Sequence, residues 1–96
     1  MAEIENKELM VVVNEDVLKE RVRQNKLWGH QRHNLGKWLG ILGEEFGEVC
    51  EAMQPLMGLT SVKETDASDL YEELIQLSAV ASAIAEQIKE EEQATK

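Results

Sequence analysis

The sequence predicts an all-α protein, a compact antiparallel helical bundle that oligomerisation completes. Apolar residues recur three and four positions apart over two long stretches, 37–54 and 66–90, which is the helical period. The only proline, Pro55, falls between them, where a helix boundary is expected. A chain of 96 residues, 43% of them hydrophobic, is large enough for one domain with a single modest core.

The first helix is expected to begin after Asn14, which is a favourable N-cap, and to end near Leu27. Residues 1–13 are then an N-terminal lead-in, in which the apolar run Met10–Val13 is either an extended segment or a docking arm. The helical domain spans residues 14–90. A polar loop over residues 28–36, bounded by glycine, leads to the next helix.

The central helix is expected from about Lys37 to near Gln54, before Pro55. At 100° per residue its core-facing apolar stripe consists of Trp38, Leu42, Phe46, Val49, Met53 and Leu56. Cys50 falls near this stripe and is interpreted as a small buried hydrophobic residue.

The last helix is expected to be capped by Asp66 or Ser68 and to run to about Glu90, with residues 91–96 as a solvated tail. Its apolar stripe consists of Leu70, Leu74, Leu77, Ala81, Ile84, Ala85 and Ile88. Several alanines near its end permit close approach of another helix. One subunit can hardly bury stripes this wide, so we expect a homodimer or homotetramer that meets through this alanine-rich face.

The net charge of −9 argues against non-specific binding to nucleic acid or to an anionic membrane. No apolar run approaches the roughly 20 residues of a membrane span, and the N-terminus lacks a signal-peptide profile. The single cysteine excludes an internal disulfide. These features lead us to expect a cytoplasmic protein.

Acidic residues occupy the margins of two predicted core faces. Glu45 and Glu48 lie beside the stripe of the central helix, and Glu73 lies beside that of the last helix, with Gln76 one turn later. No basic residue occurs from Trp38 to Val62 or between Glu64 and Gln87. Antiparallel packing brings the margins together, and crowded carboxylates there take up protons or bind a cation. Oxygen ligands favour Mg2+ or Mn2+ over Zn2+. Two solvated acidic faces remain the alternative.

The motif E-E-F-G-E at Glu44–Glu48, followed in the last helix by E-L-I-Q at Glu73–Gln76, resembles the E-E-x-x-E…E-x-x-D signature of the all-α NTP pyrophosphohydrolases. This superfamily includes MazG, the dimeric dUTPases and the dCTP pyrophosphatases. The likeness covers about residues 24–88 and includes a W-G…H segment ahead of a Lys-Trp helix.

The resemblance implies a dimeric or tetrameric bundle that cleaves a nucleoside triphosphate between the α- and β-phosphates. Mg2+, with Mn2+ as a substitute, would be held by Glu45, Glu48, Glu73 and Gln76. Glu44 or Glu45 would orient the attacking water or accept its proton. Gln76 stands where most of the superfamily has aspartate.

The predicted substrate contacts come from the first helix, the loop and the start of the central helix. The position of His33 resembles that of the substrate-contacting histidine of the dCTP pyrophosphatases, although a loop-to-helix cap explains it equally well. Trp28 is a candidate for stacking on the base, whereas Trp38 is assigned to the core. Candidates for phosphate contact, each of which can equally be solvated surface, are Lys26, Arg32 and Lys37.

The alternative function is a non-catalytic helical interaction or regulatory module. Such a module would retain the bundle and have lost turnover, and the absence of a carboxylate at Gln76 is its main support.

Overall fold

The computed structural model describes residues 7–59 and 70–95, which are almost entirely helical and contain no strand. The elements are three α-helices and one short 3-10 helix: α1 (Lys7–Trp28), α2 (Leu35–Met53), η1 (Pro55–Met57) and α3 (Leu70–Ala94). The predicted all-α class is confirmed for this part of the chain.

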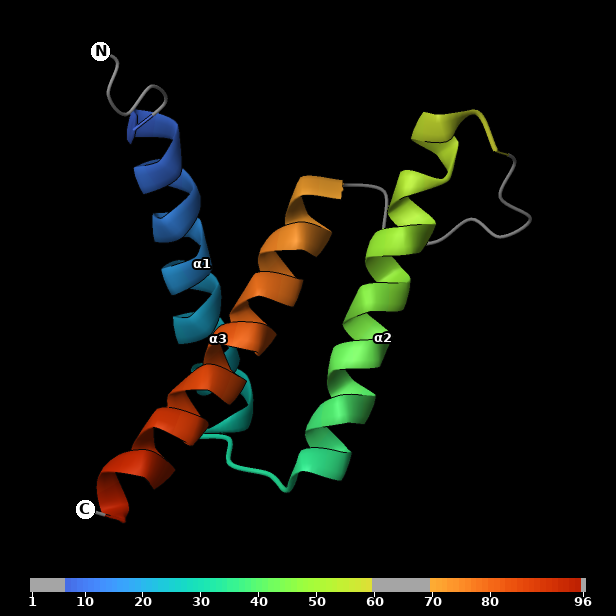
Figure 1. Ribbon diagram of the computed structural model, residues 1–96. Coiled ribbons are helices and arrows are strands. Elements are labelled where there is room, and N and C mark those ends of the chain that lie inside the picture. Colours follow the sequence, from blue (N-terminus) through green and yellow to red (C-terminus); the bar gives the residue numbers. More distant parts are fainter. Residues whose placement is uncertain (1–6, 60–69, 96) are drawn as a thin grey trace.

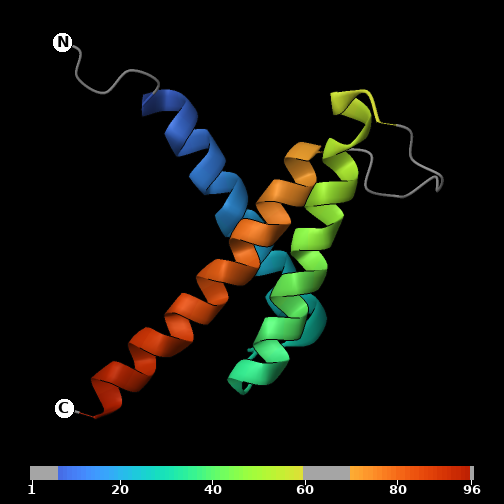
Figure 2. The ribbon, with the colours of Figure 1, turned by 45° about the vertical axis from the view of Figure 1, so that its right-hand side comes forward.

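Helix α3 is the common element of the packing, because both α1 and α2 pack against it. Figures 1 and 2 show α2 and α3 side by side and antiparallel, as predicted. Helix α1 instead crosses α3, and its N-terminal half projects away from the other helices (Figure 2). The radius of gyration is accordingly 16.0 Å, against about 12.5 Å for a compact chain of this length.

The core lies where α2 meets α3. Among residues 7–59 and 70–95, the buried hydrophobic side chains all come from these two helices: Trp38, Val49 and Ala52 from α2, and Ile75, Ala79 and Val80 from α3. The assignment of Trp38 to the core is therefore confirmed. No residue of α1 is fully buried.

The expected start of the first helix is wrong, because α1 begins at Lys7 and Asn14 lies inside it. The run Met10–Val13 is helical and exposed, not extended. No glycine or proline occurs between Lys7 and Trp28, and valine lowers helix propensity by only a few tenths of a kcal/mol. A capping residue therefore does not start a helix where the preceding residues can continue it. At the other end, Gly29 takes a left-handed φ of 80°, and its N–H donates to the carbonyl of Asn25.

Helix α2 begins at Leu35, slightly before the expected Lys37, because Asn34 is its N-cap. The Asn34 side-chain oxygen accepts a hydrogen bond from the backbone N–H of Lys37 at 2.8 Å. The helix ends at Met53, before Pro55, as predicted. Cys50 is only partly buried.

The predicted stripe of α2 is partly wrong. Phe46 is 61% exposed, Leu56 is 73% exposed and Met53 is also exposed. The face that packs on α3 is turned toward Glu45 and Ala52, since α3 is the only α-helix that packs on α2 in the described part of the chain and the contact is narrow. The apolar arc of α2 is therefore wider than its buried face.

Helix α3 continues to Ala94, so the predicted solvated tail is helical and exposed over most of its length. Its expected caps, Asp66 and Ser68, lie outside the described residues. The predicted stripe of α3 is also displaced. Ala81 and Ala85 are exposed, while the buried residues are Glu73, Ile75, Ala79, Val80 and Gln87. This shift follows from contact with two helices, α1 and α2, on different sides of α3.

Three glycines inside α2 have no packing role within the described chain. A Cβ atom added at Gly40, Gly43 or Gly47 would meet nothing within 4 Å. Each glycine costs a helix about 1 kcal/mol relative to alanine. Packing inside one subunit does not offset this cost.

None of the helices in the described part of the chain is long and apolar enough to cross a lipid bilayer.

Candidate metal centre

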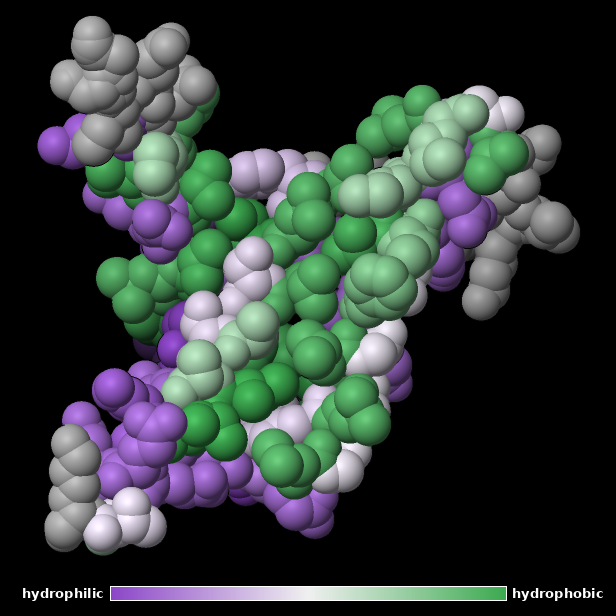
Figure 3. Space-filling model, in the orientation of Figure 1, coloured by the Kyte–Doolittle hydropathy of each residue, from purple (hydrophilic) through white to green (hydrophobic). Residues whose placement is uncertain are grey.

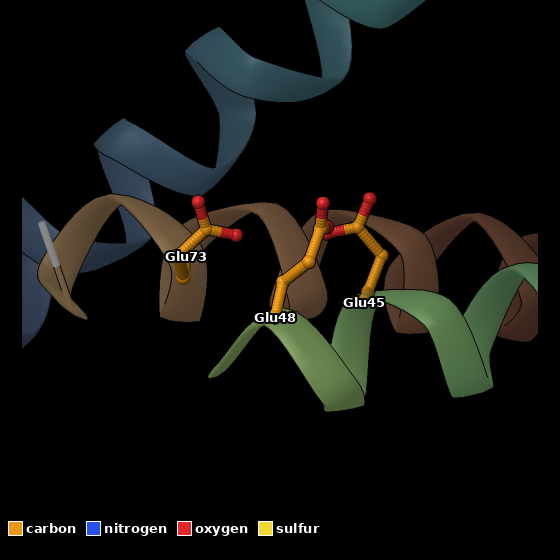
Figure 4. A group of neighbouring side chains, drawn as sticks. All are labelled: Glu45, Glu48 and Glu73. Carbon is orange, nitrogen blue, oxygen red and sulfur yellow. The ribbon is translucent and has the colours of Figure 1, made fainter. Parts of the chain in front are cut away.

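Three carboxylates converge between α2 and α3. Glu45 and Glu48 extend from α2 and Glu73 from α3, and one oxygen of each lies within 4.8 Å of the others. Figure 4 shows the three side chains pointing to the same side of the α2–α3 pair, toward α1. The structure thus brings together the three glutamates that the sequence analysis assigned to a metal. We call them the glutamate cluster.

Burial makes the charges of this cluster costly. Glu73 is buried, and Oε2 of Glu45 is buried with no hydrogen-bond partner among the described residues. Burial, the largest cause, and the charge of Glu48 beside it together raise the pKa of Glu45 to about 7, and the charge of Glu73 adds a smaller effect. Near neutral pH the Glu45 carboxyl therefore exchanges between its protonated and its ionised form.

These residues fit a small divalent cation. The donors are all carboxylate oxygens, the ligands that Mg2+ and Mn2+ prefer, and a cation would supply the charge that the cluster lacks. Together with the unsatisfied Oε2 of Glu45, this chemistry makes Glu45, Glu48 and Glu73 the residues that would hold the metal.

Helix α1 supplies charged residues near the cluster that the sequence analysis missed. Arg23 forms a two-pronged ion pair with Glu20, at 2.7 and 2.9 Å, and Gln24 also donates to Glu20. The Arg23 hydrogen bonds lower the pKa of Glu20, and Arg23 also interacts electrostatically with Glu72 and Glu45. The crossing of α1 over α3 causes this approach, and no local sequence pattern indicates such a crossing.

A cavity of about 290 Å³ lies beside the glutamate cluster, between the C-terminal half of α1, α2, α3 and the α1–α2 loop. Glu45 belongs both to the cluster and to the cavity wall. The rest of the lining combines two indole rings, two guanidinium groups and several side-chain amides: Arg21, Gln24, Asn25, Trp28, Gln31, Arg32, Trp38, Ile41, Glu44, Val80 and Ala83.

The cavity includes two of the predicted substrate-binding residues, Trp28 and Arg32. Arg32 is already engaged, because its guanidinium donates to Glu90 at 2.9 and 3.0 Å and to Glu86 at 3.3 Å. Lys26 and Lys37 are exposed and do not belong to the lining.

His33 packs against Trp38 and does not line the cavity. Its ring lies edge-on against Trp38, with ring centroids 4.8 Å apart, and its Nε2 lies 3.3 Å from the side-chain oxygen of Gln31. His33 is not among the lining residues.

Gln87 is the central polar residue of this region and was not predicted. Its Oε1 accepts hydrogen bonds from the Trp38 indole N–H at 2.8 Å and from the His33 backbone N–H at 3.1 Å. Its amide donates to the His33 carbonyl at 2.8 Å. A buried glutamine on α3 therefore fixes the loop against α2. The only sign of its burial in the sequence was its spacing: Gln87 lies two heptads after Glu73 and therefore near the same face of α3.

The remaining predicted site residues lie at the edges. Glu44 is exposed and lines the cavity next to Glu45. The Gln76 amide lies 3.5 Å from a carboxylate oxygen of Glu72, as a donor to it.

The stability of the metal-free protein is expected to fall as pH rises from about 4.5 to about 7. Glu45 has an ordinary pKa of 4.5 and a folded-state pKa of about 7, so the folded state binds more protons in this range. A shift of this size corresponds to at most about 3 kcal/mol, and solvent screening of a partly exposed carboxylate reduces it to about 1–2 kcal/mol.

Urea unfolding at pH 5 and pH 7.5 would measure this difference, with Glu45→Gln as the matched variant. The variant should lose most of the pH dependence. The carboxylates of Glu20, Glu86 and Glu90 have lowered pKa values, so their effect falls below this range. If the free energy of unfolding changes equally between pH 5 and pH 7.5 in the wild type and the variant, the partly buried position of Glu45 is contradicted.

Comparisons of the chain with models of protein families, with curated proteins and with solved structures give no match.

Proposed function

We propose that the protein is a Mg2+-dependent nucleoside triphosphate pyrophosphohydrolase, which converts an NTP or dNTP into the monophosphate and pyrophosphate. The observation that carries the proposal is that Glu45 lies both in the glutamate cluster and in the wall of the aromatic and polar cavity. Carboxylates that could hold a cation and a ligand-sized cavity therefore share a boundary, as a phosphate-bearing substrate would require. The acidic motif of the sequence supports the same chemistry.

Each acidic or amide residue of the site would have its own role. Glu45, Glu48 and Glu73 would hold Mg2+, which would neutralise charge on the phosphates and make phosphorus more electrophilic. Glu44 is exposed on the cavity wall beside Glu45 and can orient a water molecule or accept its proton. Gln76, engaged with Glu72, would contribute no charge to the cation.

The cavity suits the nucleoside part of the substrate. The exposed Trp28 ring offers a surface for base stacking, and Gln24, Asn25 and Gln31 offer side-chain amides for hydrogen bonds to base edges. Arg21 and Arg32 both pair with Glu86, so phosphate oxygens can compete with that carboxylate for them. The triphosphate would extend from the cavity toward Glu45.

The test is a screen of NTPs and dNTPs with Mg2+, measuring pyrophosphate and monophosphate. Release of pyrophosphate from at least one nucleotide, dependent on Mg2+, is the expected result. Release of inorganic phosphate instead would contradict cleavage between the α- and β-phosphates. If no nucleotide is cleaved and Mg2+ does not stabilise the protein, the non-catalytic interaction module becomes the better function.

A further inference from the structure

Two arginines of the cavity wall share one carboxylate. Arg21 on α1 and Arg32 in the α1–α2 loop both line the cavity. Glu86 on α3 accepts a hydrogen bond from each of them, at 2.9 Å from Arg21 and at 3.3 Å from Arg32. Glu86 is not among the lining residues, so it holds the two guanidinium groups from outside the cavity wall.

Burial differs between the two sides of this contact. The side chains of Arg21 and Arg32 are only 18% and 24% exposed, whereas that of Glu86 is 47% exposed. Figure 3 shows that hydrophilic residues gather over the C-terminal part of α3, the segment that contains Glu86. Water can therefore replace the arginines as partners of the Glu86 carboxylate, while the more buried guanidinium groups depend on an anion as their partner.

Glu90 has a different role at Arg32. It accepts two hydrogen bonds, from Nε at 3.0 Å and from Nη2 at 2.9 Å, which is the bidentate geometry of a strong arginine–carboxylate pair. Nη1 of Arg32 donates to the carbonyl of Gln31 at 2.8 Å. Arg32 is thus oriented by contacts other than the longer one to Glu86, and it would stay in place if Glu86 turned away.

We propose that Glu86 is an internal competitor for the phosphate groups of the ligand: it neutralises Arg21 and Arg32 in the absence of ligand and releases them when a phosphate chain enters the cavity. For the class of ligand, this inference rests on the proposed function. A phosphate chain carries more negative charge than one carboxylate and can accept hydrogen bonds from both guanidinium groups at once. Arg21 has donors available for it, because among residues 7–59 and 70–95 only Glu86 receives one of its N–H groups.

An internal competitor limits how tightly phosphates are held. Two largely buried guanidinium groups with no carboxylate beside them would bind substrate and product alike, and such uniform binding does not speed a reaction. Glu86 lowers both affinities and can pair with Arg21 and Arg32 again as the product leaves. The carboxylate therefore favours release of the phosphate product.

Removing the charge of Glu86 should tighten the binding of a polyphosphate. Glu86→Gln is expected to bind inorganic tripolyphosphate about 5-fold more tightly than the wild type. Glu92→Gln is the matched control, because it removes the same charge from the same helix at a residue that pairs with Lys89, and it should change the affinity by less than about twofold. Arg21→Gln should weaken binding by about 10-fold or more, whereas Lys26→Gln, on the same helix but outside the cavity lining, should not.

Isothermal titration calorimetry in EDTA would measure these affinities without a divalent cation and without turnover. Melts followed by circular dichroism would show that the variants are folded, and Arg21→Lys, which keeps the charge and loses the fork of donors, replaces Arg21→Gln if that variant unfolds. Failure of the proposed function is a separate result, because it appears in the nucleotide screen, which contains Mg2+.

Three outcomes would overturn the proposal. If Glu86→Gln binds tripolyphosphate no more tightly than Glu92→Gln, Glu86 only links α1 and the loop to α3. If Arg21→Gln binds as tightly as Lys26→Gln, the anion lies outside the cavity. If neither the wild type nor Glu86→Gln binds tripolyphosphate, the two arginines do not form a phosphate site.

Discussion

Replacing Glu48 with glutamine is expected to reduce pyrophosphate release by at least about 100-fold and to remove most of the stabilisation by Mg2+. Loss of even an outer-shell partner of a metal commonly costs 10- to 100-fold in affinity or activity. The effect of Glu48 should be at least as large, because its carboxylate belongs to the glutamate cluster itself, with Glu45 and Glu73. The neutral amide keeps the size of the side chain and removes its charge.

Thermodynamic linkage gives the expected size of the effect on stability. At a Mg2+ concentration of about 100 times the dissociation constant, binding stabilises the folded state by about 2.7 kcal/mol. A 100-fold weaker site gives about 0.4 kcal/mol at the same concentration. In the absence of Mg2+ the variant should be more stable than the wild type, because the charge of Glu48 is one of the causes that raise the pKa of Glu45.

The measurements are urea unfolding with and without Mg2+, beside the pyrophosphate assay on the nucleotide found in the screen. Glu51→Gln is the matched control, since it makes the same change on α2 at a residue outside the glutamate cluster. If Glu48→Gln and Glu51→Gln behave alike, the three carboxylates form only an acidic surface, and the proposed activity loses its metal site.

The sequence was sufficient to predict the helical class and the convergence of the glutamate cluster. Glu45, Glu48 and Glu73 lie at the margins of apolar stripes, and antiparallel packing of two adjacent helices brings such margins together. Periodicity therefore determines which residues meet across the α2–α3 pair. Periodicity does not determine how many residues of each apolar stripe become buried, as the exposure of Phe46 shows.

The features that the sequence did not predict depend on a helix crossing and on single hydrogen bonds. Glu20 and Arg23 approach the cluster because α1 crosses α3, and the crossing depends on which side chains of two helices interlock. The predicted start of α1 was wrong because Asn14 can cap a helix only where the helix has not already begun.

Gln87 shows the same limitation for a polar residue. A glutamine near the end of a long helix is ordinarily solvated, yet this one is buried because the Trp38 indole and the His33 backbone lie opposite it. Replacing Gln87 with alanine is expected to destabilise the protein by about 2–4 kcal/mol. The buried Trp38 N–H would lose its partner at a cost of about 1–3 kcal/mol, and the two His33 backbone groups would add less, because they are only partly buried and water can replace the glutamine.

For a chain of this size the loss corresponds to a decrease in melting temperature of about 10–25 °C. Thermal melts would measure it, with Gln93→Ala on the exposed last turn of α3 as the matched control. Tryptophan fluorescence of the same samples would report a change around buried Trp38 as a difference from the wild-type spectrum, to which exposed Trp28 also contributes.

A second variant separates the lost hydrogen bonds from the lost packing. In Gln87→Glu, a protonated carboxyl can accept from the Trp38 N–H and donate to the His33 carbonyl, as the amide does. An ionised carboxylate can still accept but cannot donate, and its charge would be buried. The variant should therefore approach wild-type stability at pH 5 and lose it by pH 8, since burial raises the pKa of the new carboxyl. If the Gln87→Glu and Gln87→Ala variants are equally unstable at pH 5, packing and not hydrogen bonding explains why Gln87 is buried, and the loop carrying His33 is positioned by other contacts.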